Sequence, residues 1–282
     1  MNQVELSAGT INYRDTGSGP PIVFVHGLLV DGTLWRKVIP QLEDRYRCIV
    51  PDLPLGSHTI AMKPDADLSP TGLAALIGEF IDKLDLNDVT LVANDTGGAL
   101  TQILLASGHT DRIGRVVLTP CDSFDNFLPP LFRPLQYLAR VPGAVNAIVQ
   151  SLRAPALRRL PMAFGWLAKR RIPNEVTRAW LEPAMTDRGV RRDVAKLLKG
   201  VDKRFTIEAA EKLPQFAKPV LIAWAPEDRF FPLEHARRLA ALLPDARVEE
   251  VPDSYTYVCE DQPERTAQLV GEFATEGAQA AR

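Results

Sequence analysis

The segment LVANDTGGAL, residues 91–100, places one carboxylate between an apolar run and the glycine-rich start of a helix. Asp95 has Ala93 two positions before it and Gly97 two positions after it. A small-x-acid-x-Gly pattern at such a junction predicts a sharp turn that exposes the central side chain. The helix N-terminus would stabilise a carboxylate or an oxyanion beside it. Asp95 is therefore a candidate nucleophile or acid–base group, and the alternative is that it only caps the helix.

Other residues that could take part in a reaction also follow apolar runs. His26 and Gly27 follow the run PPIVFV, and PDL at 51–53 ends the next run. Asp228 lies in WAPEDRFFP, directly after VLIA, and the loop SYTY, residues 254–257, follows the last run. Each of these positions is a candidate member of one site with Asp95.

The elements that must position these groups alternate between strands and helices. Continuous apolar runs of this length suit strands buried on both faces of a parallel sheet. The predicted strands lie within residues 4–9, 10–17, 20–27, 47–53, 88–95, 112–120, 218–228 and 245–254, the first two as an antiparallel pair. Helices are predicted at 69–84, 97–108, 233–244 and 263–275. This order predicts an α/β fold with a mostly parallel, doubly wound sheet.

The alternation stops between Cys121 and Lys203, where proline cuts the chain into short helical pieces. We expect an inserted helical cap at 121–205 and a core formed by 1–120 and 206–282. Residues 133–204 hold 16 Lys+Arg and 5 Asp+Glu, a net charge of +11 within a chain of net charge −2. A cationic cap would favour an anionic substrate or a membrane surface. The alternative is a set of solvated outer helix faces.

Composition narrows the possible functions. The chain is 46% hydrophobic and 24% charged, and its net charge of −2 gives no overall attraction to nucleic acid. Cys48, Cys121 and Cys259 lack metal-ligand spacing, so unpaired thiols in a reducing compartment are expected. The N-terminus has no signal-peptide core, and no apolar run reaches the roughly 20 residues of a membrane span. We expect a cytoplasmic protein with a small-molecule substrate, no cofactor, no metal and no stable membrane anchor; the sequence leaves the oligomeric state open.

The sharp turn at Asp95 is here called the elbow. The sequence resembles the α/β-hydrolase superfamily over nearly the whole chain, in the order of the His26-Gly27 dipeptide, the elbow, Asp228 and the loop 254–257. The resemblance implies that the backbone N–H groups of Leu28 and Thr96 form the oxyanion site. It also implies that Asp228 is the supporting acid.

In having an aspartate at the elbow, the sequence is similar to haloalkane dehalogenases, epoxide hydrolases and fluoroacetate dehalogenases. In these families the carboxylate attacks carbon to give an alkyl ester, which a histidine-activated water then hydrolyses. The position of that histidine holds Thr256 here, so Tyr255, Thr256 and Tyr257 are the candidates to replace it. The four histidines are His26, His58, His109 and His235, and none occupies that position.

The subfamily signals conflict. Haloalkane dehalogenases carry Trp directly after the nucleophile, where this chain has Thr96, and the fluoroacetate enzymes have RDRG instead of NDTG. Epoxide hydrolases protonate the alkoxide with two cap tyrosines. The cap here offers Tyr137, with Trp166 and Trp180 as indole donors, unless these residues only pack. Further possible pocket contacts are His26 and Asn94.

Three hypotheses remain from the sequence. The favoured one is an epoxide-hydrolase-like enzyme that acts on an apolar small molecule with Asp95 as its nucleophile. The second is a lyase or isomerase that uses Asp95 as an acid or base and forms no ester. The third is a catalytically silent ligand-binding protein on a hydrolase scaffold.

Overall fold

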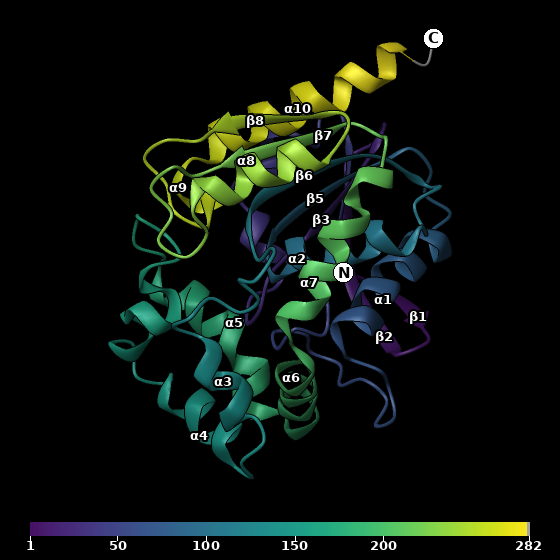
Figure 1. Cartoon of the computed structure of the whole chain (residues 1–282). Coiled ribbons are helices and arrows are strands. Elements are labelled where there is room, and N and C mark those ends of the chain that lie inside the picture. Colours follow the sequence, from purple (N-terminus) through teal and green to yellow (C-terminus); the bar gives the residue numbers. More distant parts are fainter. Residues whose placement is uncertain (281–282) are drawn as a thin grey trace.

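The fold is a single eight-stranded sheet flanked by helices (Figure 1), in a computed structural model that describes residues 1–280. The strand order is β1-β2-β4-β3-β5-β6-β7-β8. The strands are β1 (Asn2–Leu6), β2 (Gly9–Thr16), β3 (Pro21–Val25), β4 (Arg47–Pro51), β5 (Val89–Asp95), β6 (Ile113–Cys121), β7 (Val220–Trp224) and β8 (Ala246–Glu250). β1 pairs antiparallel with β2, and β2 with β4, whereas β3 to β8 run parallel. The predicted fold class and all eight predicted strands are confirmed.

The helices form two groups. The α-helices that flank the sheet are α1 (Pro70–Lys83), α2 (Thr96–Ser107), α7 (Lys203–Lys212), α8 (Leu233–Leu242), α9 (Val258–Asp261) and α10 (Pro263–Ala280). The second group, here named the cap helices, is α3 (Arg133–Leu138), α4 (Ala144–Ser151), α5 (Asn174–Thr186) and α6 (Arg188–Gly200). Short helical turns lie at Gly32–Trp35, Ile39–Gln41, Leu157–Arg159, Pro161–Gly165 and Leu213–Gln215. The cap helices gather beyond one end of the sheet (Figure 1).

Local sequence explains where the predicted helices begin and end. The Ser69 hydroxyl accepts the N–H of Gly72 at the start of α1, and Pro70 occupies the first helical position. Gly108 ends α2 in the left-handed conformation at φ 81°. The central strands β3, β5 and β6 are buried almost throughout, as strands in the middle of a parallel sheet must be.

The helix α9 lies inside the loop after β8, where the sequence predicts no helix. Its four residues have no side-chain cap, so contacts with distant elements stabilise it. The Asp261 carboxylate accepts the backbone N–H groups of Lys169, Arg170 and Tyr255. The neighbouring Glu260 pairs with Arg36. Tertiary contacts of this kind override the weak local preference of a short segment.

Buried polar contacts attach the cap helices to the core. Asp193 of α6 is fully buried, and its Oδ2 accepts the N–H of Met62 at 2.8 Å and lies 3.2 Å from His58 Nε2. The indole N–H of Trp180 in α5 donates to the Thr33 hydroxyl at 2.7 Å. Because the Asp193 and Trp180 side chains are buried and paired, the cap helices are fixed against the sheet end.

Two further features concern the chain as a whole. All three cysteines are buried and unpaired within the described residues. Among residues 1–280, none of the helices combines the length and the apolar character that crossing a bilayer requires.

Candidate active site

Asp95 lies at the point where β5 turns into α2, with φ 54° and ψ −132°. This conformation costs a non-glycine residue about 1–3 kcal/mol, so the surroundings must enforce it. A Cβ at Gly97 would collide with the carbonyl oxygen of His26, and one at Gly98 would collide with the side chain of Cys121. The two glycines therefore let the turn close, and the strained backbone projects the carboxylate.

Main-chain groups surround the Asp95 carboxylate. The backbone N–H groups of Leu28 and Thr96 both hydrogen-bond to it. A Cβ at Gly27 would collide with Asp95 Oδ2, so glycine is needed for this close approach. Two fixed donors hold the carboxylate in one orientation, and the same donors can stabilise negative charge that develops on it.

Burial raises the pKa of Asp95 from its usual 3.8 to about 7. The N–H groups of Leu28 and Thr96 oppose this rise, and the negative charge of Asp228 adds to it. At neutral pH the carboxyl therefore populates both its neutral and its ionised form, and a pKa displaced this far is typical of a functional site.

Asp228 follows β7 and is close enough to Asp95 for the two charges to interact. Its Oδ1 accepts the backbone N–H groups of Phe230 and Phe231, both at 2.7 Å. Its Oδ2 is buried and forms no well-formed hydrogen bond within residues 1–280. Burial raises the pKa of Asp228 to about 6, and its main-chain donors limit the rise.

The loop after β8 brings Thr256 to Asp228. The Thr256 carbonyl oxygen accepts Asn94 Nδ2 at 2.8 Å, which attaches this loop to the residue before Asp95. A hydrogen-bonding interaction with the nearby Thr256 hydroxyl opposes the rise in the pKa of Asp228. The hydroxyl oxygen is nevertheless buried without a well-formed hydrogen bond to any described residue. Asp228 Oδ2 and the Thr256 hydroxyl are thus two neighbouring polar groups without well-formed hydrogen bonds in the described chain.

The two tyrosines that flank Thr256 lie in different surroundings. Tyr257 is fully buried, its hydroxyl has no partner in the described chain, and burial together with the charge of Asp95 raises its pKa well above 10. Tyr255 instead accepts Arg229 Nη2 at 2.9 Å, and its ring lies beneath the cations of Arg229 and Lys169. Only Tyr257 therefore stays close to Asp95.

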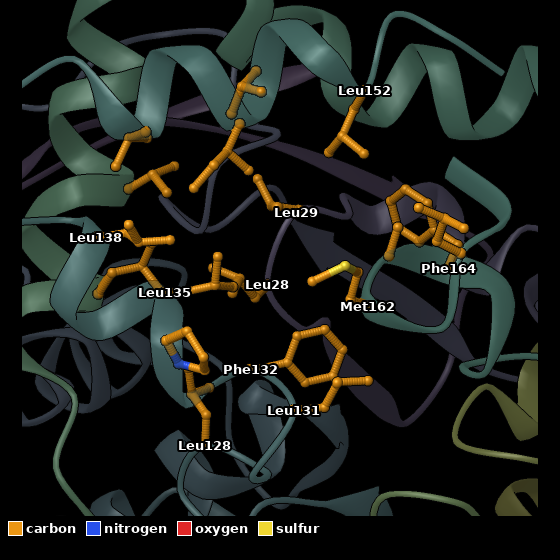
Figure 2. A pocket seen from close by; sticks show the side chains of 18 of the residues that line it. Leu28, Leu29, Leu128, Leu131, Phe132, Leu135, Leu138, Leu152, Met162 and Phe164 are labelled. Atoms are coloured by element: carbon orange, nitrogen blue, oxygen red, sulfur yellow. The ribbon is translucent and has the colours of Figure 1, made fainter. Parts of the chain in front are cut away.

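A cavity of about 310 Å³ separates Asp95 from the cap helices. Three of the described lining residues are polar, namely Asp95, Thr96 and Ser151, and the others are apolar. The Ser151 hydroxyl already donates to the carbonyl of Ile148. The side chains drawn in Figure 2 are almost entirely carbon, with Leu135 and Leu138 on the side opposite Phe164. Such a cavity suits a small apolar molecule whose reactive end reaches Asp95.

The cap residues considered as proton donors lie outside this cavity lining. Tyr137 is 66% exposed, and Trp166 is 37% exposed beneath the guanidinium of Arg229. The Trp180 indole N–H is occupied by Thr33. The structure therefore does not bring these three side chains together with Asp95.

The histidines also lie outside the described cavity lining. His26 is buried, accepts the Leu53 N–H through Nε2 and lies 2.9 Å from the Gly27 carbonyl through Nδ1. Burial lowers its pKa to about 4, so it is neutral and orders the loop that carries Leu28. His58 faces Asp193, His109 pairs with Asp82 on the surface, and the imidazole of His235 lies 3.0 Å from the Ser123 hydroxyl.

Asp122 is a site residue that the sequence analysis missed. It follows β6, is fully buried, and neither of its carboxyl oxygens has a well-formed hydrogen bond within the described residues. Burial and the charge of Asp95 hold its pKa well above the usual value, while the nearby Thr96 opposes the rise. Its sequence signal is similar to that of Asp228, an acid in the segment that follows a buried strand. Asp122 is thus a buried carboxyl close to Asp95 and Thr96, and its surroundings favour the protonated form.

Comparisons with known proteins bear on the family and the fold. A family model described as alpha/beta hydrolase fold matches residues 20–263. "Haloalkane dehalogenase 2" of Mycobacterium tuberculosis is 28% identical over 278 residues, covering 94% of this chain and 92% of that protein. "Cis-3-alkyl-4-alkyloxetan-2-one decarboxylase" of Xanthomonas campestris is 29% identical over 280 residues, covering 90% and 88%.

Solved structures agree with the fold. The haloalkane dehalogenase DbeA from Bradyrhizobium elkani superposes with a TM-score of 0.80 at 23% identity, covering 99% of this chain and 98% of that one. A thermophilic esterase from Thermogutta terrifontis gives 0.77 at 21% identity, covering 98% and 99%. At this identity the likeness extends to the fold alone.

Proposed function

The chain belongs to the α/β-hydrolase fold family, and from that premise we propose that it hydrolyses an apolar alkyl electrophile through an ester on Asp95. The observation that carries the proposal is the Asp95 carboxylate, held by the Leu28 and Thr96 N–H groups at the base of an apolar cavity. A fixed, desolvated carboxylate is oriented for attack on a saturated carbon.

In the first step, an Asp95 oxygen forms a bond to the substrate carbon, and the carbon–leaving group bond breaks with its electron pair. A halide leaves as an anion and takes up no proton, whereas an epoxide oxygen becomes an alkoxide and needs one. The described cavity lining holds no tyrosine, tryptophan or histidine to supply that proton. The geometry therefore favours a carbon–halogen bond over the epoxide that the sequence favours.

In the second step, water attacks the ester carbonyl of Asp95 while Asp228 takes its proton, and the ester C–O bond then breaks as Asp228 returns that proton to the departing alkoxide, which releases the alcohol. We assign this water to Asp228 Oδ2 and the Thr256 hydroxyl, the two adjacent buried polar atoms that have no well-formed partner in the described chain. With a pKa of about 6, Asp228 is ionised at neutral pH and can accept the proton of the water. The Leu28 and Thr96 N–H groups stabilise the oxyanion.

The relatives support this substrate class, because the Mycobacterium tuberculosis protein is named a haloalkane dehalogenase. The direct test compares 1-bromohexane with 1,2-epoxyhexane and measures halide or diol release. Asp228→Asn should accumulate a hexyl ester on the Asp95 peptide, detected by mass spectrometry, and the exposed Asp125→Asn should not. Turnover that never yields an adduct in Asp228→Asn would contradict the proposal.

One observation favours a second function, a lyase that uses Asp95 as a general acid. With a pKa of about 7, half of the Asp95 carboxyls carry a proton at neutral pH. The Xanthomonas campestris relative is named a decarboxylase of alkyl-substituted oxetan-2-ones. Incubation with a cis-3,4-dialkyl-oxetan-2-one should then release CO₂ and the alkene, with a rate that falls above pH 7. Release of the hydroxy acid alone would exclude this function.

A further inference from the structure

A second hollow, of about 260 Å³, lies in the cap and differs in character from the catalytic cavity. Its basic lining residues are Arg158, Arg159, Lys169, Arg170 and Arg171. None of the described residues that line it is an aspartate or a glutamate. A concave surface that gathers cationic side chains favours an anionic occupant.

Arg158 is the most informative of these cations, since it is only 4% exposed. Its Nη1 donates to the Asn174 carbonyl at 2.9 Å, and its Nε is buried without a partner in the described part of the chain. Burial and the positive charges of Arg178 and Arg159 lower its pKa. A buried guanidinium is normally compensated by a carboxylate, and within residues 1–280 Arg158 has none.

The other basic residues of the hollow fall into two classes. Lys169 and Arg170 are neutralised, Lys169 by Glu227 and Asp253 and Arg170 by Asp253. Arg159 and Arg171 form no ion pair with any residue that the structure describes. The unneutralised charge is therefore concentrated on Arg158, Arg159 and Arg171.

The N-terminus of α5 adds backbone donors to the same hollow. This helix of 13 residues begins at Asn174, and its first turn has no side-chain cap because Pro173 precedes it. Asn174 lines the hollow, as does Thr177, whose own N–H already donates to the Pro173 carbonyl. Uncapped N–H groups at a helix start attract anions. Glu175 is in the same turn but is exposed and does not line the hollow.

From these contacts we infer that the hollow is a binding site for a tetrahedral oxyanion, a phosphate or the phosphate group of a small organic ester. Guanidinium groups match phosphate oxygens with paired hydrogen bonds, so Arg158, Arg159 and Arg171 would share the anion. The helix start supplies further N–H donors. This proposed anion site does not depend on the reaction proposed for Asp95.

One side chain joins this anion site to the catalytic cavity. Phe164 lines both hollows and is labelled at the cavity edge in Figure 2. Gly165, the next residue, packs so closely on the Arg159 carbonyl that a side chain there would collide with it. An anion held by Arg158 and Arg159 would therefore fix the segment that carries Phe164, which forms one wall of the catalytic cavity.

The test is calorimetric titration of the whole protein with inorganic phosphate and with hexyl phosphate, at constant ionic strength set with chloride. Saturable binding is expected, and Arg158→Met should weaken it at least about tenfold. Without phosphate, Arg158→Met should raise the Tm, because it removes an uncompensated buried charge. Arg188→Ala, an exposed cap arginine outside the hollow, serves as the matched control and should bind as the parent does.

If Arg158→Met does not fold, the double variant Arg159→Ala/Arg171→Ala changes exposed residues and should lose binding to a similar extent. Tighter binding of hexyl phosphate than of phosphate would identify an organic ester as the occupant, and equal binding would identify free phosphate. Asp95→Asn should bind both anions unchanged, which separates this site from the proposed reaction. Absence of saturable binding, or equal affinity in the Arg158 and Arg188 variants, would overturn the inference.

Discussion

The elbow around Asp95 and the loop after β8 are built in opposite ways. At the elbow, glycines and main-chain N–H groups fix a single carboxylate. In the loop, the Thr256 and Tyr257 hydroxyls are buried without well-formed partners among the described residues. The nearby Asp228 carboxylate accepts well-formed hydrogen bonds through Oδ1 but not through Oδ2. The first region is complete in itself, and the second needs another molecule to satisfy its polar atoms. The difference suggests that attack and water activation are separable steps, which variants can affect one at a time.

Asp95→Asn should have the largest effect, because it removes the attacking oxygen itself. We expect a loss of at least about 10³-fold in 1-bromohexane turnover, measured as bromide release. Turnover that survives in Asp95→Ala would place the chemistry elsewhere, and turnover in neither the variants nor the parent would favour a silent binding protein.

Stability provides the control for that variant. Asp95 has a usual pKa of 3.8 and a pKa of about 7 in the folded protein, so the fold favours its protonated form. The associated stability is fully present below pH 3.8 and is lost as the pH rises through 7. Asp95→Asn should therefore be more stable than the parent at pH 8, by as much as about 4 kcal/mol, and no less stable at pH 4.

Asp228→Asn should slow hydrolysis of the Asp95 ester and leave the attack by Asp95 on the substrate unchanged. Loss of a general base typically costs about 10²–10⁴-fold, and the loss should fall on ester hydrolysis alone. Rapid-quench kinetics should show one burst of bromide per active site followed by a slow phase. A slowed burst would mean that Asp228 also serves the attack.

The pH profile should give an effect of intermediate size. Attack requires ionised Asp95, so kcat/KM should rise through pH 7 and then level off, with a value at pH 5 about 100-fold below the plateau. Initial rates from pH 5 to pH 9 measure this directly. A profile that falls above pH 7 would assign Asp95 the role of a general acid.

Thr256→Val should have a smaller effect, because it removes one hydrogen bond to the water. A loss of about 1 kcal/mol corresponds to roughly a fivefold slower hydrolysis step. Single-turnover decay of the ester measures it, with the exposed Thr71→Val as the matched control. An unchanged decay rate would remove Thr256 from the proposed water site.

The smallest effect is expected for the cap residues Tyr137 and Trp166. Because both lie outside the described cavity lining, Tyr137→Phe and Trp166→Phe should change kcat/KM by less than about twofold. A large loss with 1,2-epoxyhexane but not with 1-bromohexane would restore them as proton donors for an epoxide.

The sequence predicts the strands and the elbow because both depend on local patterns, namely continuous apolar runs and small residues beside Asp95. It cannot predict where Tyr137, Trp166 and Trp180 point, since their positions depend on how the cap helices pack. The helix α9 is missed for the same reason, since Asp261 and Glu260 gain their partners from distant segments. The excess positive charge of residues 133–204 is visible in the sequence, but the burial of Arg158 is not.

The central claim is that Asp95 forms an ester that water cleaves at its carbonyl carbon. The most direct measurement is a single turnover of 1-bromohexane in heavy-oxygen water, followed by mass spectrometry of the Asp95 peptide and of the hexanol. The account predicts heavy oxygen in Asp95 and ordinary oxygen in the alcohol, because the alcohol takes its oxygen from the carboxylate. Heavy oxygen in the alcohol and none in Asp95 would contradict it, since water would then have attacked the substrate directly.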